Sequence, residues 1–170
     1  MKVYFAGKFN MLKDKKKDLS ERLINDYRSK ILGDSKRITL ASDNVIFNDK
    51  YVYCGPFYSE QASNGDFTSI DCNAVLSAEY ESVKECDVFF VLFDENFSVG
   101  SVVELDWALD LGKKIIIYYK EEESDHDIKS EYWFSILNAM KKSNHLVVHS
   151  FKEINEVIND VRNGDVFYEV

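Results

Sequence analysis

Residues 88–93 read Val-Phe-Phe-Val-Leu-Phe, six apolar side chains in a row. A half-buried strand alternates apolar and polar residues, whereas a strand covered on both faces of a parallel sheet is apolar throughout. A second run of this kind, Ile-Ile-Ile-Tyr-Tyr, occupies residues 115–119. Between the two runs, residues 102–111 have the length and spacing of a helix that ends near Gly112. The stretch therefore predicts a strand–helix–strand unit of a parallel sheet.

The same alternation continues on both sides of this unit. Residues 2–6 form a short β-rich segment that ends at Gly7. Helical spacing is seen at 11–32, 71–83, 131–142 and 152–162, and strand composition at 38–47, 50–54 and 146–149. Residues 57–69 are rich in Ser, Asn, Gly and Asp and are expected to form a loop. The pattern predicts one α/β domain over residues 1–170, with a doubly wound, flavodoxin-like or Rossmann-like, mostly parallel five-stranded sheet and helices on both faces.

Composition narrows the classes of function. The chain has 170 residues, and its 45% hydrophobic and 14% aromatic content excludes wholesale disorder. Its 30 Asp and Glu against 21 Lys and Arg give a net charge of −9, which argues against a polynucleotide partner because such partners are bound mainly through Lys and Arg. No apolar run approaches the ~20 residues of a membrane helix, and the first residues lack the long apolar stretch and the cleavage site that a secretory signal is expected to have. We expect a compact cytoplasmic protein without a membrane partner.

Metal and cofactor signatures are missing from the sequence. The three cysteines form no CxxC pair, and an odd count suits reduced thiols. The three histidines, His126, His145 and His149, have no metal-binding spacing with any Cys or Asp. There is no G-x-G-x-x-G run and no P-loop. We therefore expect neither a metal nor another cofactor.

Ligands of an open parallel sheet bind beyond the carboxyl ends of its strands. This rule selects residues 6–10, 55–69 and 94–104, of which the last is the most informative. It joins a strand end, a loop of small and polar residues, and Glu104 in the first turn of the predicted helix. A dehydrated, ionised carboxylate there has the chemistry of a retaining-glycosidase nucleophile. An acid in the first turn is also common for helix stability alone, so position leaves both interpretations open.

Several runs resemble the nucleoside 2-deoxyribosyltransferase family, including its nucleoside-monophosphate N-glycosidase branch. They are Tyr4-Phe5-Ala6-Gly7-Lys8-Phe9, Ser98-Val99-Gly100-Ser101-Val102-Val103-Glu104-Leu105, Glu85-Cys86-Asp87-Val88, and Trp107-Ala108 with Gly112-Lys113-Lys114-Ile115. The second run is similar to the family's S/D-x-G-x-x-x-E-L signature. The resemblance covers roughly residues 1–10 and 79–119, with a weaker echo in the aromatic tail 165–170, and its motifs occur in the family's order.

The resemblance implies roles for three side chains. Glu104 matches the nucleophile that forms a covalent glycosyl-enzyme intermediate, and Tyr4 matches the tyrosine that holds and orients it. Glu79 stands eight residues before Asp87, where the family has an Asp that protonates the departing nucleobase. Asp71 is the rival for that role because it opens the same predicted helix. The alternatives are a core aromatic for Tyr4 and a solvated helix acid for Glu79.

The resemblance also implies a set of substrate-binding residues. They are Gly7, Lys8, Phe9, Phe57, Tyr58, Asp71, Asp94, Ser98, Gly100 and Ser101. Ser98 stands where the nucleoside branch has Asp and the monophosphate branch has Ser, so nucleoside and nucleotide both stay open. Phe57 or Tyr58 would line a base pocket, with core packing as the alternative.

The predicted function is N-glycosidic bond cleavage and nucleobase exchange on (deoxy)nucleosides. Its small-molecule partners are a nucleoside or nucleotide and a free nucleobase, and we expect a homo-oligomer because subunits of this family usually share pockets. One alternative is a hydrolase of nucleoside 5′-monophosphates or of NAD. Another is a nucleotide sensor that binds in the same pocket without turnover.

Overall fold

The computed structural model describes residues 1–7, 38–40, 50–59, 72–94, 99–121 and 132–170. Its strands are β1 (Lys2–Ala6), β2 (Ile38–Leu40), β3 (Val52–Tyr53), β4 (Phe57–Ser59), β5 (Val88–Phe93), β6 (Lys114–Lys120) and β7 (Leu146–Phe151). Its helices are α3 (Cys72–Glu85), α4 (Val99–Asp110), α5 (Trp133–Lys142) and α6 (Ile154–Asn163), followed by the 3₁₀ turn η2 (Asp165–Tyr168). The predicted helix at 11–32 lies outside the described residues.

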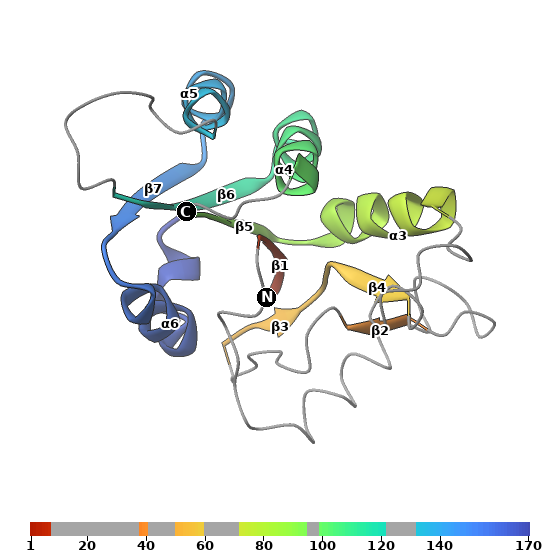
Figure 1. Ribbon diagram of the computed structural model, residues 1–170, viewed down its shortest axis with the longest axis horizontal. Coiled ribbons are helices and arrows are strands. Elements are labelled where there is room, and N and C mark those ends of the chain that lie inside the picture. The colour runs from red at the N-terminus through yellow and green to blue at the C-terminus, as the bar shows by residue number, and fades with distance from the viewer. Residues whose placement is uncertain (8–37, 41–49, 60–71, 95–98, 122–131) are drawn as a thin grey trace.

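Five strands form one sheet in the order β3-β1-β5-β6-β7, and every neighbouring pair is parallel. This is the flavodoxin-like order, in which the chain winds outward in both directions from β1. Figure 1 shows α4 and α5 on one face of the sheet and α6 on the other. The predicted doubly wound α/β fold is therefore confirmed.

The apolar strand β5 is buried on both faces, as its composition predicts. Successive side chains of a strand point to opposite faces. Phe89 stacks on Tyr4, with ring centroids 5.4 Å apart, whereas Phe90 lies against Phe5 and Phe167. Phe167 belongs to η2, so the end of the described chain completes the core on the second face.

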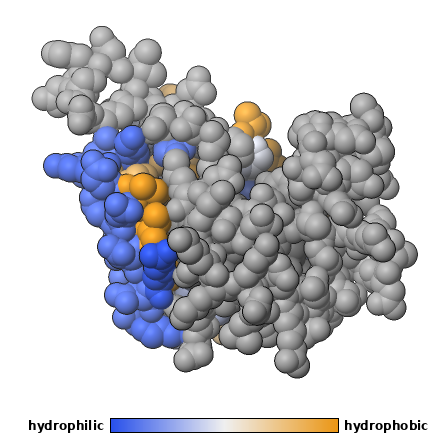
Figure 2. Space-filling view, turned by 60° about the horizontal axis from the view of Figure 1, so that its bottom comes forward, coloured by the Kyte–Doolittle hydropathy of each residue, from blue (hydrophilic) through white to orange (hydrophobic). Residues whose placement is uncertain are grey.

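The outer surface of α6 is polar. Val157 and Val161, four residues apart, are buried, and the residues between them turn mostly polar side chains outward. Figure 2 shows hydrophilic surface with a narrow hydrophobic strip on the side of the molecule where α6 lies. None of the helices in the described residues has the length and hydropathy to cross a membrane.

The prediction of a loop over residues 57–69 is wrong at its start. Residues Phe57–Ser59 form β4, which pairs antiparallel with β2 outside the main sheet. Two adjacent aromatic residues favour a strand, but the partner strand lies about twenty residues earlier, where a local pattern cannot reveal it. Residues 60–71 and 41–49 lie outside the description.

Helix α4 begins at Val99, three residues before the predicted start at 102. Gly100 and the β-branched Val99 are poor helix formers, so the sequence pattern places the start too late. Glu104 is consequently the sixth residue of the helix, and its first turn holds no acid. The field of a helix N-terminus fades within one turn, so it does little for the Glu104 carboxylate.

Candidate active site

Tyr4 and Glu104, 100 residues apart in sequence, meet in the interior. The Tyr4 hydroxyl donates a hydrogen bond of 2.7 Å to Glu104 Oε1. Tyr4 is 0% exposed and Glu104 only 6%. The pair joins strand β1 to helix α4, so two of the three proposed catalytic side chains are in direct contact.

The position of Glu104 on its helix is unusual for an acid. Ser101, Leu105 and Ala108, at spacings of three, one and four residues, are all buried with it. Glu104 therefore stands on the core face of α4, where ionisable residues rarely occur without a partner. The Tyr4 hydroxyl is such a partner, because it donates a short hydrogen bond to the Glu104 carboxyl.

Glu79 contributes a second buried carboxyl from α3. Its side chain is 9% exposed, so the interpretation as a solvated helix acid is wrong. Helices α3 and α4 pack together, and Tyr80 meets Trp107 edge to face at 5.5 Å beside this site. The packing places Glu79 close enough to Glu104 for their charges to repel.

Burial controls the ionisation of both acids. It raises the pKa of Glu104 from 4.5 to about 8; the Tyr4 hydrogen bond lowers that pKa, and the charge of Glu79 raises it. Burial likewise raises the pKa of Glu79 to about 7. Two interacting groups of this kind titrate as a unit, and these values leave one proton on the pair at about pH 7.5. Such a pair supplies one acid and one base at neutral pH.

Only some of the other predicted site residues lie in the part of the chain that the structure describes. Asp94 directly follows β5 and is buried, and Ser101 is buried on α4. Gly100 is the second residue of α4 and is exposed. Phe57 and Tyr58 lie on β4, of which only the backbone is described. Lys8, Phe9, Asp71 and Ser98 lie outside the described residues.

Gly7 has a structural explanation of its own. Its φ of +119° is in the region that favours glycine, and a Cβ there would lie 2.8 Å from the Leu92 carbonyl oxygen. The missing side chain lets the chain leave β1 in contact with β5. Gly7 thus stands at the carboxyl edge of the sheet, where the site is expected.

The tail 165–170 packs at the opposite, amino edge of the sheet. Lys114, the first residue of β6, donates from Nζ to the Val170 carbonyl at 2.8 Å. Val170 also borders a pocket of about 640 Å³ whose wall includes Met1 and Val88, at the starts of β1 and β5. The tail of this chain therefore lies away from its own Glu104.

Tyr4→Phe is expected to lower kcat by about 10- to 100-fold, because a hydrogen bond to a charged group contributes about 1.5–3 kcal/mol. The hydroxyl lowers the pKa of Glu104, so its removal should move the pH limb that depends on Glu104 to higher pH. Steady-state rates between pH 6 and 9.5 measure both effects. Tyr168→Phe is the control, because that hydroxyl is bonded to the Lys50 carbonyl away from the site. An unchanged pH limb in Tyr4→Phe would refute the role of the hydroxyl.

Neither a protein-family model nor a curated protein matches the chain. Among solved structures, the CMP N-glycosidase BcmB of Clostridium botulinum aligns with a TM-score of 0.52 and 18% identity, over 98% of this chain and 99% of that one. A structure of a Sir2 enzyme aligns with a TM-score of 0.32 and 14% identity, over 66% of this chain and 51% of that one, which is too weak to support an inference. The first likeness shows a shared fold.

Proposed function

We propose that the protein cleaves the N-glycosidic bond of (deoxy)nucleosides or their monophosphates through a covalent intermediate on Glu104. The observation that carries the proposal is the buried Tyr4–Glu104 hydrogen bond with the Glu79 carboxyl packed beside it. The likeness to a CMP N-glycosidase supports it at the level of fold. The sequence resemblance supplies the roles.

The reaction takes two balanced steps. In the first, an ionised Glu104 oxygen attacks C1′ of the sugar, the C1′–N bond breaks, and its electron pair leaves with the nucleobase, which takes a proton from Glu79. This forms a glycosyl ester on Glu104 and leaves Glu79 ionised. In the second, water or a free base attacks C1′ and gives its proton to Glu79, and the ester bond breaks to restore the Glu104 carboxylate.

The two carboxyls suit these reaction steps because the steps need one proton on the pair, with Glu79 protonated and Glu104 ionised. In the free protein burial raises the pKa of both carboxyls, to about 8 for Glu104 and about 7 for Glu79, so the two share one proton near neutral pH. A nucleobase nitrogen or oxygen that accepts a hydrogen bond from Glu79 stabilises the protonated form of Glu79. Substrate binding would then transfer the negative charge to Glu104, the state that attacks.

A base-exchange assay tests the proposal. Deoxyinosine, deoxyadenosine, deoxycytidine, cytidine, CMP and dCMP are incubated with and without a second free base, and products are separated by chromatography. Exchange identifies a transferase, whereas release of free base without exchange identifies a hydrolase. Turnover of monophosphates alone would indicate a nucleotide N-glycosidase, one of the two substrate classes that Ser98 leaves open. Inertness towards all of these substrates would end the proposal.

Two alternatives are separated by added measurements. Release of nicotinamide from NAD would indicate an NAD glycosidase instead. A sensor without turnover would bind nucleotides and show no covalent adduct by mass spectrometry after acid quench of wild type. A glycosyl adduct that disappears in Glu104→Gln favours the enzyme.

The helices over the site carry an apolar outer surface that suits a second copy of the chain. Helices α3, α4 and α5 lie side by side on one face of the sheet (Figure 1). Leu76, Val103 and Phe134, one on each helix, are exposed, Phe134 to 77%. Exposed large apolar side chains on three neighbouring helices are typical of an interaction face.

We therefore expect an oligomer, with a light-scattering mass that is a multiple of 19.7 kDa at micromolar concentration. Phe134→Asp should lower the mass toward that of one chain, since it places a charge in the contact. Asn159→Asp adds the same charge at an exposed polar position of α6, on the opposite face of the sheet, and should not. A wild-type mass of 19.7 kDa would contradict the expectation.

A further inference from the structure

Gly55 lies directly against the ring of Tyr4. It follows β3, and its carbonyl accepts a 2.9 Å hydrogen bond from the Phe5 amide, so it extends the pairing of β1 with β3. Its φ is +151°. A Cβ at this position would lie 2.5 Å from Tyr4 Cε2 and 2.7 Å from Cδ2. Such distances are far below carbon–carbon contact, so any side chain here displaces the ring.

The opposite wall of this narrow space is α3. The same Cβ would lie 3.0 Å from Ser82 Cβ, and Ser82 stands one turn after Glu79. Gly55 therefore separates the strand that carries Tyr4 from the helix that carries Glu79. The absence of a side chain at residue 55 sets how closely these two elements approach.

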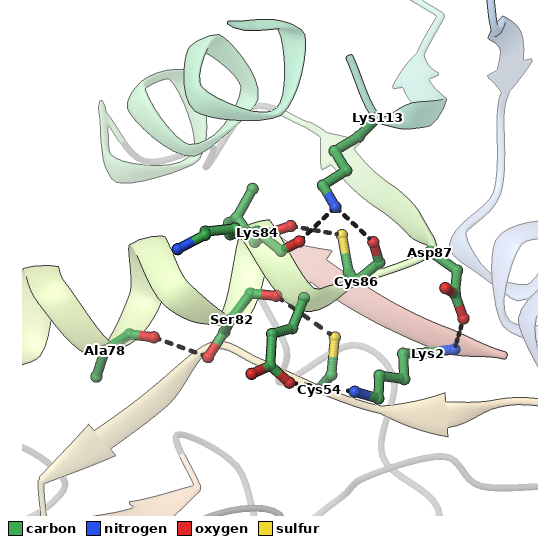
Figure 3. Close-up of polar contacts among 10 residues, drawn as sticks. Lys2, Cys54, Ala78, Ser82, Lys84, Cys86, Asp87 and Lys113 are labelled. Atoms are coloured by element: carbon green, nitrogen blue, oxygen red, sulfur yellow. Dashed lines mark hydrogen bonds and ion pairs between the residues drawn. The ribbon is translucent and has the colours of Figure 1, made fainter. Parts of the chain in front are cut away.

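Helix α3 is fixed at its C-terminal end by polar contacts that Figure 3 shows. Lys113 donates from Nζ to the carbonyls of Lys84 and Cys86, and the Lys2 amide donates to Asp87 at 2.7 Å. Ser82, in the buried half of the helix, bonds back to the Ala78 carbonyl at 2.8 Å. Because α3 is held, a side chain at residue 55 is accommodated mainly by movement of the Tyr4 ring.

The Tyr4 ring is supported on another side by β5. Tyr4 pairs with Phe89 across the sheet, and their rings are stacked with an angle of 10° between the planes. Phe89 and Gly55 together define one position for the ring. In that position the hydroxyl reaches Glu104 at 2.7 Å.

We propose that Gly55 is a positioning residue of this site, whose missing side chain fixes the Tyr4 hydroxyl on Glu104 and sets the separation of the Glu79 and Glu104 carboxyls. The inference rests on the proposed function for its kinetic consequences. Its structural content, the placement of a hydroxyl on a carboxyl, is measurable without turnover. The sequence offers only a weak signal for it, a Gly-Pro pair after a short strand.

A double-mutant cycle tests the proposal. Gly55→Ala should lower kcat by about 10- to 100-fold with little change in KM, and should move the pH limb of Glu104 upward, as Tyr4→Phe does. In the Tyr4→Phe background the same alanine should cost less than about twofold, because the hydroxyl on which it acts is gone. The ring, the close contact and the backbone strain are the same in both backgrounds. Equal losses in the two backgrounds would overturn the proposal.

Gly112→Ala is the matched control. Gly112 also has a positive φ, +64°, but no atom lies within 4 Å of a Cβ placed there. It carries backbone strain without the contact, so it should lower the melting temperature and leave kcat and the pH limb unchanged. If Gly55→Ala does not fold, Phe89→Leu removes the other support of the ring and should move the same limb upward. An unmoved limb in Phe89→Leu would also overturn the proposal.

Carboxyl titration separates this inference from the proposed function. Glutamate labelled with ¹³C at the side-chain carboxyl is followed by NMR in wild type, Glu104→Gln and Gly55→Ala. An inactive wild type ends the proposed function, whereas the positioning role stands if Gly55→Ala shifts the Glu104 titration to higher pH. A Glu104 titration identical in Gly55→Ala and wild type ends the positioning role, whatever the activity.

Discussion

Glu104→Gln is expected to abolish turnover and at the same time to stabilise the fold at pH 8. Loss of a catalytic nucleophile lowers kcat by about 10⁴-fold or more. The stabilisation arises because burial raises the pKa of Glu104 to about 8, so the folded protein resists ionising a carboxyl that ionises freely when unfolded. The glutamine amide is neutral, and its oxygen can still accept the Tyr4 hydrogen bond.

The stabilising effect has a defined pH window. When folding raises the pKa of a carboxyl, its protonated form stabilises the folded state. For Glu104 this stabilisation is complete below the unfolded pKa near 4.5 and is lost as pH rises to about 8. Wild type and Glu104→Gln should therefore differ least near pH 4.5 and most at pH 8 and above. We expect about 2–5 kcal/mol at pH 8, or roughly 5–15 °C in Tm. Urea unfolding at pH 4.5, 6.5 and 8 measures it.

Asp110→Asn is the control for this prediction. Asp110 lies on the same helix with an exposed carboxylate, 3.8 Å from Lys142, and a surface pair of this kind contributes little. The substitution should change neither activity nor the pH dependence of stability. A Glu104→Gln variant that is less stable than wild type at pH 8 would show that Glu104 is a structural acid.

The fold was predictable because its central signal is local. A strand that is apolar throughout indicates burial on both faces of a parallel sheet. β5 and β6 each show this pattern within six or seven consecutive residues. β4 was not predictable in the same way, because its partner β2 is distant in sequence and both strands have only three residues. Short strands that pair at long range leave little trace in a single sequence.

The candidate site also has features that the sequence predicts and features that it does not. The contact between Tyr4 and Glu104 was expected from the resemblance to the deoxyribosyltransferase motifs, which implies that Tyr4 holds the Glu104 carboxyl. The burial of Glu79 depends on the packing of α3 against α4, which no spacing within α3 reveals. The start of α4 decided the electrostatics: because Glu104 is in the second turn, burial outweighs the helix N-terminus.

Glu79→Gln is expected to lower turnover of ordinary nucleosides by about 10²- to 10⁴-fold, because it removes the proton donor of the departing base. A purine nucleoside methylated at N7 carries its positive charge already and leaves as a neutral base without a proton. Glu79→Gln should therefore keep most of the wild-type rate with such a substrate. Glu81→Gln, two residues further on the solvent-exposed side of α3, should behave as wild type with both substrates.

The pH profile gives Glu79→Gln a second, independent signature. In wild type the reactive form holds one proton on the two carboxyls, so turnover rises with the first ionisation of the pair and falls with the second, which gives a narrow bell between pKa values of about 7 and about 8. In Glu79→Gln the falling limb disappears, because no acid is left to deprotonate. The one limb that remains is that of Glu104, with a pKa below about 8, because the charge of Glu79, which raises the pKa of Glu104, is gone. A bell that persists in Glu79→Gln would assign the acid to another residue, of which Asp71 is the first to test.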